Sequence, residues 1–342
     1  MKKRVKQLFS KLENIDAVLI RNKYPLSDPN FVYFANMKRE DIKGYLNHDV
    51  FLILRPDCTA DIVEAEEIKS HVVKYDSIGM NFPYITASDY LKVRKIVGHE
   101  PIDVSKELEE IKLIKDCEEI KNIKRSCEIS DKIFAQINEL VDENKDEEDV
   151  LDEIEYLAKK NGSDGMAFKS SIAFGKNTSI YNYRAGNKKI KEGDAIIIDI
   201  GPIYNFYASD SSRVFAFKRA SKNMKKIEEK VINLQDLVFN AIKSDARNKD
   251  VCELVMKKIG DDRKLLRHCF GHDVGLTFPY SFKKTKKIDP AFDFTFKEDM
   301  IFAVEMGLYD ENIGLRIEDT VRVKKGGVEP LTKYPRFIEV IR

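Results

Sequence analysis

The stretch IIIDIGPIYNFYASDSSRVF, residues 196–215, contains two acids, each beside an apolar run typical of a strand. Asp199 lies in the first run, and Asp210 lies within the alternating run that follows a turn. We expect the two runs to form an antiparallel hairpin centred on Tyr204 and Asn205. In that register the two aspartates lie opposite each other, with Cβ atoms about 5 Å apart.

Two carboxylates this close destabilise a fold unless a cation lies between them or one of them is protonated. One of the acids could instead cap a turn, so the pair alone leaves metal binding and a structural role open. Tyr-Asn is not a preferred two-residue hairpin turn, and a longer symmetric loop would preserve the same pairing.

Further residues of the same chemistry follow in the C-terminal half. The segment LRHCFGHDVGLTF, residues 266–278, contains His268 and His272, and the glycines around His272 favour a strand or loop over a helix. Glu305 and Glu318 each lie inside an apolar strand-like run. A buried carboxylate costs free energy unless it is paired or bound to a metal. Two divalent ions would neutralise the four acids, so the set favours a two-metal site over a single zinc.

The order of elements predicts an α+β protein with two domains. Residues 1–110 are typical of a small α/β domain, with strands expected at 15–20, 31–36, 49–56 and 60–65 and a helix at 85–97. A charged amphipathic helix within 101–141 opens the second domain, 111–342. Its other helices are expected at 146–162, 223–244 and 248–262, and its strands at 166–174, 194–200, 206–217, 300–308, 313–323 and 335–341.

Composition narrows the class of protein. The 342 residues allow two domains, and 59 Lys and Arg almost balance 58 Asp and Glu. This balance argues against nucleic acid or an anionic membrane as a partner. Five scattered cysteines without a CxxC pair favour a reducing compartment. With no signal-peptide pattern and no long apolar window, we expect a cytoplasmic globular protein.

The order Asp, Asp, His, Glu, Glu, in the settings DIGPIYNFYASD, GHDVG, AVEMG and RIEDT, resembles that of the pita-bread (creatinase-fold) metallopeptidases. Within that group the chain most resembles Xaa-Pro dipeptidases (prolidases) and Xaa-Pro aminopeptidases. The resemblance covers nearly the whole chain, because DPNFVYFANM and the strands around it resemble the creatinase-type N-terminal domain. It implies such a domain over 1–110 and a catalytic domain over 111–342, with a curved antiparallel sheet flanked by helices.

Applied to this chain, the resemblance implies a site for two divalent metal ions, with Mn, Co, Zn and Fe as candidates. Asp199 and Asp210 would bind one ion and His272 and Glu305 the other, while Asp210 and Glu318 would bridge both. Glu305 would also serve as the acid and base for a water between the ions, which attacks the substrate carbonyl as hydroxide.

Residues around these ligands are predicted to assist them. Arg316 and Asp319 flank Glu318 and are expected to orient the ligands. His268 matches a family position and, four residues before His272, is expected to line the cleft and to share in proton transfer.

Two positions depart from the family pattern. The loop FGKNTSIYNY, residues 174–183, has Asn182 in place of a family histidine and Tyr181 in place of the preceding proline, whereas Tyr183 matches. The second histidine, which follows GHxxGL in the family, is replaced by Pro279. These histidines help to bind the substrate and to stabilise the tetrahedral intermediate. Asn182 can donate a hydrogen bond but cannot carry a proton, and Pro279 can do neither.

Three functions therefore compete. The first is a dinuclear enzyme that removes the N-terminal residue from short X-Pro peptides. The second is a metallohydrolase of the same fold with a shifted substrate, and the third is a non-catalytic binding protein. Retention of all the ligands argues against the third, because unpaired buried carboxylates are a burden without metal. The resemblance also implies a possible homodimer.

Overall fold

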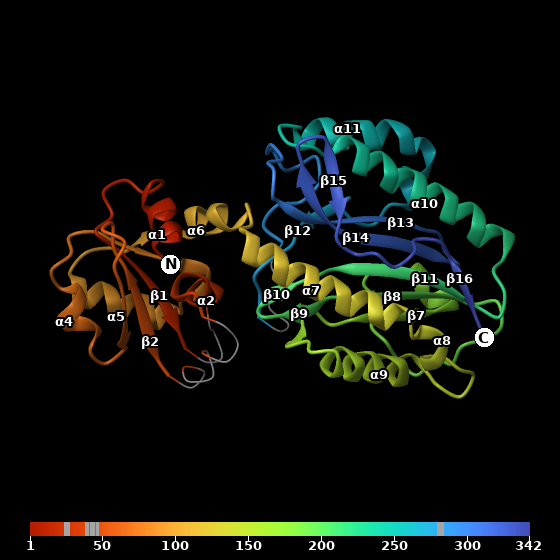
Figure 1. Ribbon diagram of the computed structural model, residues 1–342, viewed down its shortest axis with the longest axis horizontal. Coiled ribbons are helices and arrows are strands. Elements are labelled where there is room, and N and C mark those ends of the chain that lie inside the picture. The colour runs from red at the N-terminus through yellow and green to blue at the C-terminus, as the bar shows by residue number, and fades with distance from the viewer. Residues whose placement is uncertain (24–27, 38–40, 42–44, 46–47, 279–283) are drawn as a thin grey trace. The chain divides into compact units, whose positions relative to one another are not determined.

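The computed structural model describes residues 1–23, 28–37, 41, 45, 48–278 and 284–342 (Figure 1). The chain divides into two compact units, Met1–Leu113 and Ile114–Arg342. Each unit has a hydrophobic core of its own. None of the helices in the described part of the chain combines the length and the apolar character needed to cross a membrane.

The N-terminal unit is built on a five-stranded mixed sheet in the order β3-β2-β1-β4-β5. Its strands are β1 (Ala17–Asn22), β2 (Val50–Leu54), β3 (Ala60–Glu64), β4 (Ile78–Met80) and β5 (Ile102–Asp103). The described helices are α1 (Lys2–Phe9), α2 (Pro29–Ala35), α4 (Ile68–Val72), α5 (Ala87–Val97) and α6 (Ser105–Lys112). β1 is antiparallel to β2 and parallel to β4, so the sheet is mixed around its central strand.

The strand predicted at 31–36 is wrong, because these residues belong to helix α2. Asp28 caps the helix by accepting a hydrogen bond from the Asn30 amide at 2.9 Å, and Pro29 occupies the first turn. Asn36 ends the helix in the left-handed region, with φ of 55°. The aromatic run suggested a strand, but the capping residues on both sides determine the outcome.

The second unit contains the large sheet. Eight strands form it, in the order β12-β13-β14-β11-β8-β7, with β15 beside β14 and β16 beside β11. They are β7 (Ser171–Phe174), β8 (Ala195–Ile200), β11 (Ser211–Phe217), β12 (Gly271–Asp273), β13 (Ile301–Tyr309), β14 (Gly314–Lys324), β15 (Gly327–Pro330) and β16 (Glu339–Ile341). A second, three-stranded sheet contains β6 (Gly165–Met166), β9 (Pro202–Tyr204) and β10 (Tyr207–Ala208).

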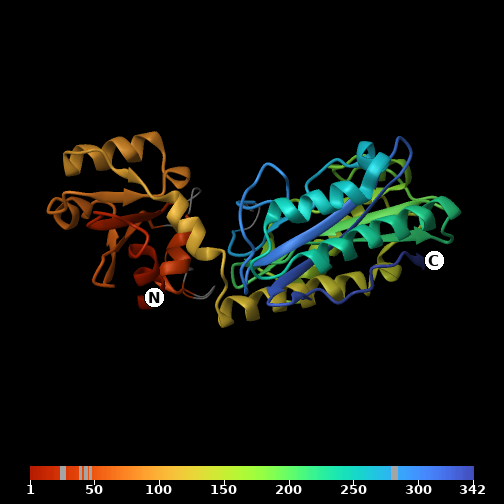
Figure 2. The ribbon, with the colours of Figure 1, turned by 90° about the horizontal axis from the view of Figure 1, so that it is seen from above.

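Helices flank the large sheet. They are α7 (Cys117–Phe134), α8 (Ile137–Leu140), α9 (Glu147–Lys160), α10 (Lys222–Ala241) and α11 (Asn248–Ile259). In Figure 1 the strands β13, β14, β11 and β8 lie between α10 above and α9 below. α10 packs on β13 and β14, α9 packs on β7, and α11 lies against α10 over the sheet (Figure 2). Capping boxes, in which Asp116 and Asp146 are the N-cap residues, begin α7 and α9.

The hairpin around residues 199–210 has a different register from the predicted one. Its turn falls at Asn205 and Phe206, which have φ of 50° and 70°, a combination typical of a type I′ turn. Ser212, rather than Asp210, therefore lies opposite Asp199. The predicted direct pairing of the two aspartates is wrong. Asp210 lies two residues before Ser212, at the entrance of the same strand.

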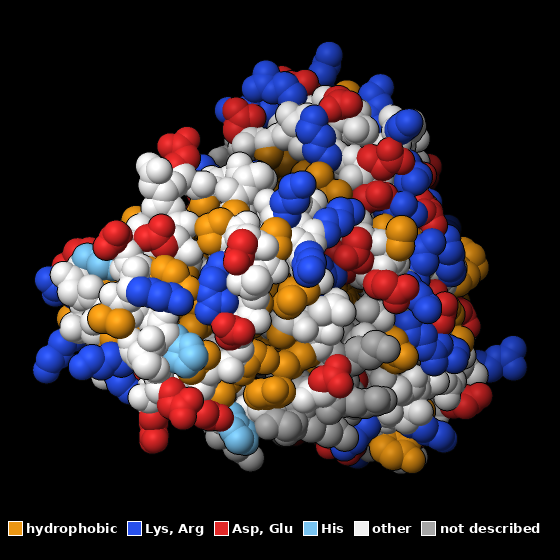
Figure 3. All heavy atoms as spheres, turned by 60° about the vertical axis from the view of Figure 1, so that its left-hand side comes forward, with side chains coloured by type: hydrophobic (Ala, Val, Ile, Leu, Met, Phe, Trp, Pro, Cys, Tyr) orange, Lys and Arg blue, Asp and Glu red, His pale blue; other side chains and the backbone are white. Residues whose placement is uncertain are grey.

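The surface has no single sign of charge on the face shown in Figure 3, where Lys and Arg side chains are interspersed with Asp and Glu. This distribution agrees with the near balance of 59 basic and 58 acidic residues in the sequence.

Candidate metal centre

Adjacent strands of the large sheet bring the five predicted ligands into one region. Glu305 on β13 lies directly opposite Glu318 on β14. His272 on β12 pairs with Ala303 of β13, two residues before Glu305. Asp199 lies on β8 and Asp210 just before β11, which pairs with both β8 and β14. Neighbouring strands lie about 4.8 Å apart, so the register alone places these side chains close together.

The imidazole of His272 lies at the centre of the cluster. Its Nε2 atom is 3.3 Å from Asp210 Oδ2, 3.8 Å from Glu305 Oε1 and 3.8 Å from Glu318 Oε1. One donor atom from each of Asp210, His272 and Glu318 lies within 4.8 Å of the others. Ligands that bind one ion at about 2.1 Å lie roughly 3–4 Å from each other, so this spacing suits a divalent cation.

Burial makes the acids of the cluster costly without a cation. Burial, followed by the charge of Asp199, raises the pKa of Asp210 well above its usual value. Burial and the charges of Asp210 and Glu305 raise the pKa of Glu318 in the same way. Within the described residues, Asp199 Oδ1 and Asp210 Oδ1 are buried without a hydrogen-bond partner. Hard oxygen donors in this state, together with one imidazole, fit divalent metal ions.

The pKa of Glu305 is shifted in the opposite direction, downward. Burial by itself would raise its pKa, but the charges of His268, His272 and Lys284 outweigh it and lower the pKa to about 2. Burial lowers the pKa of His272, which favours the neutral imidazole that a metal ion requires. When both imidazoles are neutral, the charges of Lys284 and Arg316 are those that remain to keep Glu305 ionised.

Arg316 contacts one predicted ligand directly and a second one through a hydroxyl group. Its Nη2 atom is 2.6 Å from Asp199 Oδ2, and its Nε atom donates to Ser212 Oγ at 3.0 Å. Ser212 in turn donates to Glu318 Oε2 at 2.9 Å. One guanidinium therefore fixes a carboxylate on β8 and, through a hydroxyl, a carboxylate on β14.

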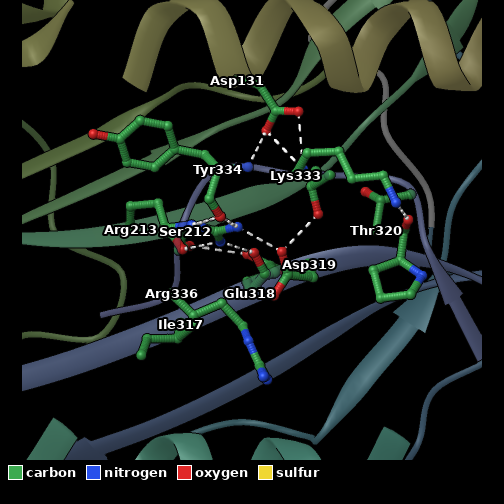
Figure 4. A network of polar contacts seen from close by, with 12 residues as sticks. Asp131, Ser212, Arg213, Ile317, Glu318, Asp319, Thr320, Lys333, Tyr334 and Arg336 are labelled. Carbon is green, nitrogen blue, oxygen red and sulfur yellow. Dashed lines mark hydrogen bonds and ion pairs between the residues drawn. The ribbon is translucent and has the colours of Figure 1, made fainter. Parts of the chain in front are cut away.

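Asp319 lies on the other side of the sheet, because successive residues of a strand point to opposite faces. Its Oδ1 atom accepts a hydrogen bond from Arg213 Nη2 at 2.6 Å (Figure 4). It accepts another from Thr332 Oγ1, also at 2.6 Å. Arg213 also donates from Nη1 to the backbone oxygens of Ser212 at 2.9 Å and Glu318 at 2.7 Å. Asp319 thus acts on the backbone that carries the ligands, through Arg213, and not on the ligand carboxylates themselves.

His268 is buried beside Glu305. Its Nδ1 atom lies 2.7 Å from the Cys269 oxygen and 3.2 Å from Glu305 Oε2, and its Nε2 atom lies 3.1 Å from Tyr309 Oη. Burial lowers the pKa of His268, which favours a neutral ring. The residue precedes β12 instead of lying on the strand, and its side chain is only 2% exposed. His268 therefore lies behind the wall of the cleft. The expectation was that it would line the cleft.

A cavity of about 390 Å³ opens over the ligands and is of a size that suits small molecules. Asn182 and Tyr183 line it, and Pro279 falls outside the described residues. Tyr183 donates its hydroxyl to Glu147 Oε2 at 2.7 Å, so this atom supports the loop. The complete lining comprises Phe168, Lys169, Ser171, Tyr181, Asn182, Tyr183, Arg184, Asp199, Asp210, Lys284, Glu305, Arg316 and Glu318.

Sequence reasoning missed Glu147, which holds the loop that carries Asn182. The fully buried carboxylate accepts hydrogen bonds from the amides of Phe174 at 2.7 Å and Gly186 at 3.1 Å and from Asn177 Nδ2 at 2.9 Å. It lies at the start of α9 among other acids, where the sequence suggests only a favourable helix terminus. Arg213 was also missed, although a charged residue inside the apolar run SSRVFAF is the same signal that identified Glu305.

Comparison with known proteins identifies relatives of the chain. The model of metallopeptidase family M24 matches residues 121–325. The chain is 28% identical to the Xaa-Pro dipeptidase of Pyrococcus furiosus over 98% of this chain and 99% of the relative. An uncharacterized peptidase of Methanocaldococcus jannaschii is 36% identical over 70% of this chain and 69% of its own length. The crystal structure of the prolidase from Pyrococcus horikoshii OT3 superposes with a TM-score of 0.84 at 25% identity, covering 98% of each chain. These matches confirm the predicted α+β pita-bread fold and the family resemblance.

Proposed function

The chain belongs to metallopeptidase family M24, and on that premise we propose that it hydrolyses short Xaa-Pro peptides with two bound divalent ions. The single observation that carries the proposal is the convergence of His272 with three buried carboxylates at distances of 3.3–3.8 Å. Two divalent ions, when bound, would lower the pKa of a water and polarise the scissile carbonyl.

The residues of the chain account for the remaining chemistry. Glu305 is ionised, buried and part of the cavity lining, so its carboxylate is available to accept the proton of the attacking water and to return it to the leaving nitrogen. His268, whose Nδ1 atom lies 3.2 Å from Glu305 Oε2, keeps that carboxylate in position. Arg316 holds Asp199 at 2.6 Å and prevents its rotation away from the ligand set.

The rim of the cavity favours dipeptides over longer chains. Lys169 and Arg184 line it and are exposed. In a dipeptide the free C-terminal carboxylate lies within a few bonds of the scissile carbonyl, where these cations would attract it. An X-Pro-amide lacks that charge. We therefore expect X-Pro dipeptides to be cleaved faster than their amides, at low salt above all.

A hydrolase of the same fold with a shifted substrate is the second candidate, and Asn182 is the observation that favours it. Asn182 lines the cavity but is exposed and cannot carry a proton. Asn182→His should raise kcat on an X-Pro substrate if proline peptides are the true substrates. An unchanged or lower rate would favour a pocket rebuilt for another peptide.

The proposed function is tested by metal content and by hydrolysis together. The full chain, loaded with Mn, Co, Zn or Fe in turn, is assayed against a panel of X-Pro dipeptides, X-Pro-amides and dipeptides without proline. We expect about two metal ions per chain and release of the N-terminal amino acid from the X-Pro dipeptides. Stoichiometric metal binding without hydrolysis of any peptide would favour the non-catalytic binding protein. Absence of metal uptake would contradict the assignment of the metal site.

A further inference from the structure

Tyr181 is a cavity residue whose ring is held from several sides. The ring stacks on His268 with centroids 4.9 Å apart and an interplanar angle of 22°. It meets Tyr309 edge-on at 6.1 Å and 73°, and the Arg316 guanidinium lies 5.9 Å from its centroid. Arg316 Nη1 also donates to the backbone oxygen of Tyr181 at 3.3 Å. These contacts leave the ring little freedom to turn.

Tyr181 lines the same cavity as Asp210, Glu305 and Glu318. Among the residues that the structure describes, none forms a hydrogen bond with the Tyr181 hydroxyl, whereas the hydroxyls of Tyr183 and Tyr309 are both hydrogen-bonded. Burial and the charge of Glu305 raise the pKa of Tyr181 to about 12. The phenol therefore keeps its proton at neutral pH and is available as a donor. Partly buried tyrosine hydroxyls usually find a partner, and here a bound substrate can supply it.

We infer that Tyr181 is a catalytic residue whose hydroxyl donates a hydrogen bond to the carbonyl oxygen of the scissile peptide bond. The inference rests on the proposed peptidase function and identifies the donor that Asn182 and Pro279 do not supply. When the water oxygen bonds to the carbonyl carbon, Glu305 accepts a proton from the water and the π pair moves onto the carbonyl oxygen. The Tyr181 proton stays on the phenol, and its hydrogen bond to that oxygen strengthens as the charge develops.

The positions of the other polar residues favour Tyr181 for this role. Asn182 is exposed, so a donor there is solvated and less fixed. The Tyr183 hydroxyl is bonded to Glu147, and the Tyr309 hydroxyl is bonded to Arg316 and lies 3.1 Å from His268. Tyr181 alone of these lines the cavity with a fixed ring and a hydroxyl that has no hydrogen bond within the described part of the chain. A donor that is fixed before the reaction needs no reorganisation during it.

Tyr181→Phe tests the inference, because it removes one oxygen and keeps the ring that stacks on His268. With metal-loaded enzyme we expect kcat/KM on an X-Pro dipeptide to fall by about 10²–10³, the usual cost of one lost oxyanion donor. The fall should lie in kcat, with KM nearly unchanged. Metal content and the unfolding transition should match those of the wild type. Tyr156→Phe, at an exposed tyrosine (64%), is the matched control and should behave as wild type.

A binding measurement separates this role from a structural one. A phosphinic X-Pro analogue presents an oxyanion where the tetrahedral carbon would form, and calorimetry should find it bound more weakly by Tyr181→Phe by a similar factor. A reduced analogue, with a methylene in place of the carbonyl, should bind both proteins equally. If the wild-type enzyme cleaves no X-Pro peptide, the proposed function itself is contradicted. If the wild type is active, a Tyr181→Phe variant with unchanged kcat and unchanged phosphinate affinity, or with lost metal, overturns the role of Tyr181.

Discussion

Arg316 and Asp199 form a buried contact of 2.6 Å between Nη2 and Oδ2, and the same guanidinium reaches Glu318 through the Ser212 hydroxyl. The arginine side chain is 3% exposed, so solvent does little to weaken the interaction. Since a planar guanidinium can donate hydrogen bonds to Asp199 and to Ser212 at the same time, it fixes two candidate ligands relative to each other.

Arg316→Lys should therefore weaken metal binding. A lysine keeps the charge but cannot contact Asp199 and Ser212 together, so both carboxylates gain freedom. We expect the dissociation constant of the metal to rise by about 10–100-fold, measured by calorimetry with the metal-free protein. Arg322→Lys is the matched control, because Arg322 lies on the same strand and pairs with Asp299 instead of a candidate ligand. Equal metal affinity in wild type and Arg316→Lys would contradict the role.

Asp210→Asn should have opposite effects on the metal-free and the metal-loaded protein. In the metal-free fold the pKa of Asp210 is raised, mainly by burial, so the folded state favours the protonated form. The stability that the protonated Asp210 contributes is present at low pH and is lost as the pH rises through the pKa of the folded state. At neutral pH a neutral Asn should thus raise the free energy of unfolding of the metal-free protein, by about 1–4 kcal/mol.

The same variant should lose metal uptake, since the amide is a poor replacement for a bridging carboxylate. Thermal unfolding with and without a chelator, together with elemental analysis, measures both effects. Asp261→Asn, at an exposed aspartate, should change neither. A variant that binds metal at full stoichiometry would remove Asp210 from the ligand set.

The sequence allowed the candidate ligands to be proposed because each acid interrupts an apolar run, and such runs were also what predicted the strands. The details that failed depend on local backbone chemistry. The turn lies at Asn205 and Phe206, and a bulky residue with positive φ is not expected from propensity. Helix α2 was missed because its aromatic residues outweighed the capping signal of Asp28.

Glu147 could not be found from sequence for a different reason. Two of its partners are the backbone amides of Phe174 and Gly186, and amides leave no signature in a sequence. The inward direction of its side chain depends on how α9 packs against β7, which is tertiary information. His268 also shows this limit, because spacing predicted a position near His272 but not its burial against Glu305.

Glu147→Gln should destabilise the second unit and disturb the cavity loop. The carboxylate of Glu147 now accepts hydrogen bonds from backbone N–H groups. The NH2 group of a glutamine would face these N–H groups donor to donor, so at least one buried donor would lose its partner. We expect a loss of about 1–3 kcal/mol in the free energy of unfolding and a higher KM, since Asn182 lies on the supported loop. Glu148→Gln, at the exposed neighbour, should leave urea unfolding and KM unchanged. Identical unfolding curves for Glu147→Gln and wild type would refute this account.

His268→Ala should lower kcat and leave metal uptake intact. The imidazole lies 3.2 Å from Glu305 Oε2, so its loss frees the carboxylate that exchanges the proton. We expect a fall in kcat of about 10–100-fold. Because burial lowers the pKa of His268, any limb that it contributes to the pH–rate profile should lie below about 6.5 and should disappear in the variant. His48→Ala, at an exposed histidine, is the control. An unchanged kcat with an unchanged profile would make His268 purely structural.

Asp89→Asn should destabilise the N-terminal unit in a pH-dependent way. Asp89 pairs with the buried Arg21 and accepts a hydrogen bond from Thr86 Oγ1 at 2.7 Å. Burial by itself would raise the pKa of Asp89, but these two partners outweigh it and lower the pKa. A lowered folded pKa stabilises the fold above the unfolded pKa of about 3.9, and this stabilisation is lost as the pH falls through the folded value.

At pH 7 we expect Asp89→Asn to lower the stability of this unit by about 1–3 kcal/mol, because Arg21 loses one of its two acidic partners. The difference from wild type should shrink as the pH falls below about 4. Hydrogen exchange of the β1 amides, compared between the two proteins at each pH, measures this difference in stability without interference from the second unit. Asp76→Asn, at an exposed aspartate, should leave β1 protection unchanged. A difference from wild type that persists undiminished at pH 3 would show that the Asp89 charge is not what stabilises the unit, because the carboxyl should by then be substantially protonated in the unfolded state.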